Sequence, residues 1–128
     1  MAPLYEKYSG DLDVTAVYVE ALMNLNPWTL WNKDASTGEI TPVDDSTLML
    51  IKIMEDAFEN VPGAKEHPAL CHLYCHALEL SPYPERALPA ADVLRTLMQA
   101  VVTWSTCHHT STHGLANGKK QWIVILLL

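Results

Sequence analysis

Apolar side chains recur at helical spacing in two stretches of the first half of the chain. One stretch begins at a capping aspartate, Asp11 or Asp13, and ends at Asn26-Pro27, because the residue before a proline disfavours helical geometry. The other runs from Asp44 to about Asn60 and presents an apolar face that is broad for a surface helix. The pattern predicts two helices, the second contacted from two sides.

The second half of the chain predicts two further helices. One spans His67 to Pro82, with Pro68 in its first turn and Ser81-Pro82 closing it. The next spans Glu85 to about Leu97 and turns four apolar residues inward. Pro89 lies about one turn into this stretch, so it either kinks the helix or marks its true start. The inward residues are Leu88, Ala91, Leu94 and Leu97.

The segments between these helices contain polar residues and turn signals. Residues 1–10 form a short polar lead. Pro27 to Trp31 fits one helical turn with Trp28 and Trp31 on the same side, where they are expected to pack against neighbouring helices. Residues 32–43 are expected to form a polar loop. The predicted fold class is therefore all-α.

Three of the predicted helices end in a similar way. Each ending has a small residue, then large apolar residues, then a proline, as at Ala21 to Pro27, Ala57 to Pro62 and Ala77 to Pro82. The second helix of a tetratricopeptide (TPR) repeat ends in this manner, in repeats of about 34 residues. The spacings here are irregular, so the pattern alone gives only partial support to a repeat.

Several blocks of sequence together resemble a family of TPR repeat-containing proteins over about residues 8–97. The resemblance implies a TPR-like α-solenoid fragment made of antiparallel helix pairs over residues 1–97, with a role in protein–protein interaction. Cys71 and Cys75 occupy positions where the family usually has aliphatic residues. The matching blocks are Asp11 to Val14, Glu20 to Trp28, Leu30-Trp31, His67-Pro68, His72, Tyr74, His76-Ala77, Glu79 and Pro84 to Asp92.

Residues 98–128 fit neither the family nor a periodic pattern. Trp104 to Ser111 can be back-translated so that a one-base frame shift yields Leu-Val-His-Met-Pro-Ser-His-Ile, which follows the last matching helix in the family. We therefore expect an out-of-frame tail that is poorly ordered. The family's flanking helices would then be missing, which predicts uncovered apolar faces, low stability and self-association.

Composition narrows the possible partners. The 128 residues carry a formal net charge of −7, which argues against binding nucleic acid or an anionic membrane surface. No apolar run reaches the roughly 18 residues of a membrane span, and no apolar leader follows Met1. The three cysteines do not suggest a disulfide framework. A cytoplasmic protein with a protein or peptide partner is the expectation.

The helix predicted over His67 to Pro82 carries the candidate chemistry. His72, His76 and Glu79 follow at i, i+4 and i+7, which places them on one stripe of the helix. Two histidines at i, i+4 can chelate one metal ion. Cys71 and Cys75 lie about 100° around the helix from these histidines, so one ion cannot easily take all four.

Two functions follow from these residues. The leading prediction is a non-enzymatic scaffold without a cofactor, whose groove and packing residues include Trp28, Trp31 and Tyr74. The alternative is a metal-binding or metal-dependent hydrolase-like protein, with zinc or another divalent metal at His72, His76 and Glu79. In that alternative Glu79 is a ligand or the general base, and the metal activates water.

Overall fold

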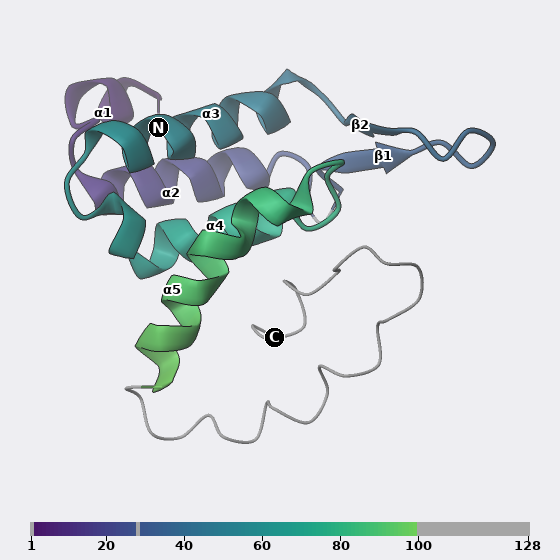
Figure 1. The fold of residues 1–128 in the computed structure, drawn as a ribbon. Coiled ribbons are helices and arrows are strands. Elements are labelled where there is room, and N and C mark those ends of the chain that lie inside the picture. Colours follow the sequence, from purple (N-terminus) through teal and green to yellow (C-terminus); the bar gives the residue numbers. More distant parts are fainter. Residues whose placement is uncertain (1, 28, 100–128) are drawn as a thin grey trace.

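The computed structural model describes residues 2–27 and 29–99, with side chains up to Leu97. The described chain is mainly helical and includes one small β-hairpin (Figure 1). The described residues do not include Trp28 or residues 100–128. Almost all of the predicted tail, residues 98–128, therefore lies outside the described residues. The elements in order are α1 (Ala2–Lys7), α2 (Leu12–Met23), β1 (Trp31–Lys33), β2 (Ile40–Pro42), α3 (Asp45–Asn60), η1 (Ala64–Glu66), α4 (Pro68–Leu78), η2 (Pro84–Ala87) and α5 (Leu88–Gln99).

Aspartate caps begin α2 and α3 as the sequence predicts. The side chain of Asp11 accepts hydrogen bonds from the backbone N–H groups of Asp13 and Val14, so Asp11 is the N-cap of α2. Asp44 caps α3 through the N–H groups of Ser46 and Thr47. These bonds satisfy donors that the first helical turn leaves without an intrahelical partner.

Prolines and a histidine set the limits of the later helices. His67 caps α4, where its side chain accepts from the N–H of Leu70, and Pro68 opens the first turn. Pro89 is the second residue of α5, so it marks the start of that helix and does not kink it. The helix α4 ends at Leu78, before the predicted stop at Ser81-Pro82, because the chain already turns there through a bond from the Ser81 N–H to the Leu78 carbonyl.

The described chain is mainly helical, in line with the predicted all-α class, but the segment expected to be a polar loop forms a small β-hairpin. Residues 31–33 and 40–42 pair as antiparallel strands, with Trp31 opposite Pro42 and Lys33 opposite Ile40. Trp31 therefore lies in a strand and not in a helical turn. The strands are three residues each, too short for an alternating pattern to appear in the sequence. Asp34 and Gly38, with Gly38 at φ 72°, form the turn that joins them.

The N-terminal lead, expected to be a short polar segment, contains the short helix α1. Its Tyr5 ring stacks on the ring of Tyr18 in α2, with centroids 4.8 Å apart. Burial is the main cause that raises the pKa of Tyr5, followed by the nearby carboxylate of Asp56. Through this aromatic pair, α1 packs against the side of α2.

The core lies where α2, α3 and α4 meet, and α4 also contacts α5. The broad apolar face of α3 contacts both α2 and α4, which confirms that prediction. Leu50 and Met54 of α3 and Leu70 of α4 are fully buried. Burying such a side chain stabilises a fold by about 1.5–3 kcal/mol.

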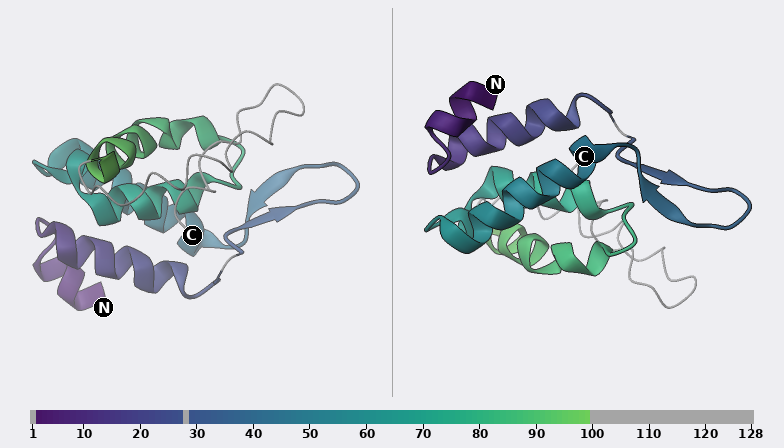
Figure 2. Two further views of the ribbon diagram at one scale, coloured as in Figure 1. Left: turned by 90° about the horizontal axis from the view of Figure 1, so that it is seen from below. Right: turned by 90° about the horizontal axis from the view of Figure 1, so that it is seen from above.

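The hairpin extends from one end of the helical body in each view (Figures 1 and 2).

Leu48 and Met49, at the start of α3, are exposed, whereas most apolar residues of that helix are buried. Self-association and the antiparallel, solenoid-like arrangement of helices both stay predictions. Within the described residues, no helix combines the length and the apolar character needed to cross a membrane.

Candidate functional site

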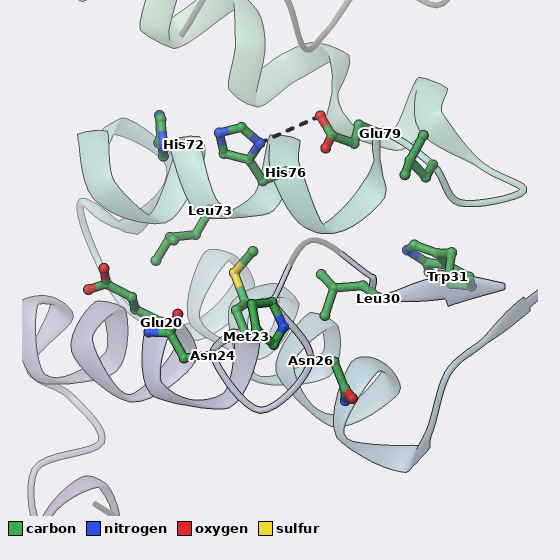
Figure 3. A pocket seen from close by; sticks show the side chains of 12 residues that line it. Glu20, Met23, Asn24, Asn26, Leu30, Trp31, His72, Leu73, His76 and Glu79 are labelled. Atoms are coloured by element: carbon green, nitrogen blue, oxygen red, sulfur yellow. Dashed lines mark ion pairs between the residues drawn. The ribbon is translucent and has the colours of Figure 1, made fainter. Parts of the chain in front are cut away.

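A pocket of about 280 Å³ opens between α2, α4 and the segment that leads into β1 (Figure 3). Helix α4 forms one wall, and the end of α2 forms the other. Apolar side chains from both walls and from the connecting segment line much of the surface, and polar side chains are spread among them. The lining residues are Glu20, Met23, Asn24, Asn26, Pro27, Leu30, Trp31, His72, Leu73, His76, Glu79 and Leu80.

The predicted stripe of His72, His76 and Glu79 contributes to the α4 wall of this pocket. The two imidazole rings meet edge to face, with centroids 4.6 Å apart and an angle of 71° between their planes. Nδ1 of His76 lies 3.5 Å from Oε2 of Glu79 (Figure 3). Helical spacing therefore places the three side chains in a row along this wall, with His76 in contact with both His72 and Glu79.

Glu79 is held at this wall by the end of the helix. It is the C-cap residue of α4, and its backbone N–H still bonds to the Cys75 carbonyl. Its Oε2 is buried and accepts no hydrogen bond from the described part of the chain. The pairing with His76 is thus electrostatic, at a distance longer than a normal hydrogen bond.

The charge state of His72 follows from its surroundings. Burial lowers its pKa, and the neighbouring His76 lowers it further, whereas the carboxylate of Glu20 acts in the opposite direction. Burial disfavours the charged imidazolium because the protein interior solvates charge poorly. His72 therefore favours the neutral form, which can either donate or accept a hydrogen bond in the pocket.

The site's metal-binding role stays a prediction. Among residues 2–27 and 29–99, no group of three or more histidine, cysteine or acidic side chains is arranged to hold an ion. The histidines are close to each other, but the Glu79 carboxylate is turned toward His76. A carboxylate in that position orients the imidazole of His76, as carboxylates do beside the histidine ligands of metal sites.

The α2 wall was not anticipated from the sequence. Glu20 and Asn24 line it together with Met23. Glu20 and Asn24 are four residues apart, so they lie on one face of α2, and this spacing was the available signal. What the sequence did not indicate is that this face would lie across from the histidines of α4.

Trp31, one of the three residues assigned to the groove or to packing, lines the pocket. Its indole Nε1 donates a 2.7 Å hydrogen bond to the carbonyl of Ala77. That carbonyl belongs to the last turn of α4, where helix carbonyls lack intrahelical partners. Trp31 therefore anchors β1 to the end of α4. Trp28 lies outside the described residues.

Tyr74, the third residue assigned to the groove or to packing, does not line the pocket. Its hydroxyl donates a 2.7 Å hydrogen bond to Glu55 of α3, and its ring packs edge to face on Phe58 at 5.2 Å. Glu55 also pairs with Arg86. Burial and the bond to Glu55 raise the pKa of the Tyr74 phenol. Tyr74 thus packs toward α3 and acts in the core.

The two cysteines of α4 also lie outside the pocket lining. Both are buried; Sγ of Cys71 is 3.2 Å from the Lys65 carbonyl, and Sγ of Cys75 is 3.9 Å from the Ala87 carbonyl. Burial raises the pKa of Cys71 to about 11 and that of Cys75 to about 12. Such thiols are poor nucleophiles. They contact Lys65 and Ala87, neither of which lines the pocket.

The resemblance to TPR proteins rests on residue patterns alone. Comparison of the chain with family models, with curated proteins and with solved structures finds no match in any of the three. Membership of the TPR family therefore stays a prediction. Any function has to be inferred from the pocket between α2 and α4.

Proposed function

We propose that the chain is a TPR-like helical scaffold, without catalytic activity of its own, that binds a partner peptide through the pocket between α2 and α4. The observation that carries this proposal is the composition of the pocket wall. Ligand sites are concave, mostly apolar, and contain a few convergent polar groups. Leu30, Leu73 and Leu80 supply apolar surface here, and the His72 to Glu79 stripe supplies polar groups.

The size of the pocket favours a single side chain as its occupant. Its volume of about 280 Å³ is just below the lower limit of about 300 Å³ for small-molecule sites. A peptide that places one anchoring side chain in such a pocket and the rest of its chain along the rim fits this size. Anchors of this kind carry much of the binding energy in peptide recognition.

A cytoplasmic setting is part of the proposal. Cys71 and Cys75 are free thiols one helical turn apart, which is compatible with a reducing compartment. The net charge of −7 disfavours nucleic acid as a partner.

Selection from a displayed library of random short peptides tests the proposal. Leu80 lines the pocket and is 52% exposed, so Leu80→Asn alters the rim without opening the core. Leu48 is also 52% exposed but lies on α3 and does not line the pocket, which makes Leu48→Asn a matched control. Selected peptides should bind the wild type and the control equally and lose at least about tenfold in affinity with Leu80→Asn. Equal binding to all three proteins contradicts the proposal.

We propose metal binding as a second candidate function, because two histidine rings meet edge to face beside a carboxylate. Zinc or another divalent metal would be held by His72 and His76, with Glu79 as ligand or as orienting partner. Elemental analysis of the purified protein, before and after His76→Ala, tests it. A stoichiometric metal that is lost with His76→Ala supports the site; a folded wild type that binds no zinc in a titration contradicts it.

A further inference from the structure

The carboxylate of Glu79 lacks a full partner. Its side chain is only 17% exposed, and Oε2 receives no hydrogen bond from the described residues. A carboxylate removed from water is costly unless hydrogen bonds or an opposite charge compensate it. His76, at 3.5 Å, supplies that compensation only in part, and only when it is protonated. Because Oε2 itself is shielded from solvent, a donor that enters the pocket would pair with the carboxylate through its other oxygen.

The rest of the pocket is suited to a positive charge. The described lining contains two carboxylates, Glu20 and Glu79, and no lysine or arginine. Glu20 lies on α2, across the pocket from the histidines (Figure 3). The neutral form of His72, favoured by burial, adds no positive charge that would repel a cation. The chain as a whole is acidic, with a net charge of −7.

We infer that the occupant of this pocket is the side chain of an arginine in the partner peptide, with its guanidinium directed to Glu79. This inference rests on the proposed function and specifies the chemistry of its ligand. The planar guanidinium offers five donors and pairs with carboxylates in a forked geometry. Its faces can stack on the aromatic rings of Trp31 and His76, which both line the pocket. Its aliphatic stem fits the apolar wall formed by Leu73 and Leu80.

Titration with blocked amino acids, followed by NMR of labelled protein, tests the inference. The probes are N-acetyl-arginine methylamide and the citrulline compound, which has nearly the same shape but no charge. The arginine compound should shift the amide signals of His76 and Glu79 in a saturable manner and bind at least about tenfold more tightly than the citrulline compound. Equal affinity of the two compounds, or shifts centred away from the pocket, overturns the inference.

A substitution tests the role of the carboxylate itself. Glu79→Gln keeps the shape of the side chain and removes its charge, so the preference for arginine over citrulline should disappear. The comparison of the two compounds on wild-type protein still decides the matter if that variant does not fold. If pocket-dependent peptides from the library lack arginine, the inference fails and the proposed function stands. If no selected peptide depends on Leu80, the proposed function itself fails.

Discussion

The indole of Trp31 donates a 2.7 Å hydrogen bond to the carbonyl of Ala77, 46 residues further along the chain. This bond joins the first strand of the hairpin to the last turn of α4. Both residues lie next to the pocket: Trp31 lines it, and Ala77 directly follows the pocket residue His76. The hairpin therefore helps to define the pocket, although it extends away from the helical body.

Removing the indole donor should destabilise the protein. Trp31→Phe keeps an aromatic ring but leaves the Ala77 carbonyl without this bond, and we expect a loss of about 1 kcal/mol in the free energy of unfolding. Urea denaturation followed by circular dichroism measures it. Tyr83→Phe, at an exposed aromatic residue, is the control and should change little. Equal stability of Trp31→Phe and wild type would show that the bond is not formed in solution.

A second bond supports the same region from α3. Thr47 is fully buried, and its Oγ1 donates a 3.1 Å hydrogen bond to the carbonyl of Leu30, a pocket residue. Thr47→Val should cost about 1 kcal/mol of unfolding free energy, because the carbonyl keeps its other bond from the Val43 N–H.

Thr96 provides the comparison for this substitution. Among the described residues, its hydroxyl bonds only to the Asp92 carbonyl one turn earlier, at an exposed position. Thr96→Val should therefore leave the unfolding free energy nearly unchanged. A loss at Thr96 as large as that at Thr47 would indicate a general effect of the valine substitution.

The turn of the hairpin predicts a pH dependence. The hydroxyl of Ser36 and the N–H groups of Thr37 and Ser36 bond to Asp34, and they lower its pKa from 3.8 to about 2. Because the folded pKa is depressed, the stabilisation is complete above pH 3.8 and is lost as pH falls toward about 2. An NMR titration of the carboxyl carbon should give a midpoint near 2, and Ser36→Ala should move it up toward 3.8. A wild-type midpoint at 3.8 would contradict the described turn.

The cysteines of α4 should be unreactive in the folded protein. With pKa values of about 11 and about 12, Cys71 and Cys75 hold almost no thiolate at neutral pH. Iodoacetamide should label both at least about a hundredfold more slowly in buffer than in urea, with the sites identified by peptide mass spectrometry. Rapid labelling of either residue in native buffer would show that its side chain is not buried.

The helices were largely predictable because their signals are local. Capping aspartates, helix-opening prolines and apolar spacing each act within a few residues, and Asp11, Asp44 and Pro68 stand where such signals place them. The stripe of His72, His76 and Glu79 was predictable for the same reason, since helical geometry alone brings these side chains together.

The hairpin and the opposite wall of the pocket were not predictable in this way. Strands of three residues carry too few positions for an alternating pattern, and the bond from Trp31 to Ala77 joins distant segments. The placement of Glu20 across from His72 depends on how α2 packs on α4, which no local pattern specifies. Tyr74 was assigned to the groove or to packing, and only its long-range bond to Glu55 reveals the packing role.

The most direct test of the account is NMR mapping of a selected peptide onto the labelled protein. Binding in the pocket should shift the amide signals of Met23, Leu73 and His76 and the indole signal of Trp31, which come from three separate segments that all line the pocket. The exposed residues Leu48 and Met49 should not respond. Shifts centred on Leu48 and Met49, with no change at the pocket residues, would contradict the claim that this pocket is the binding site.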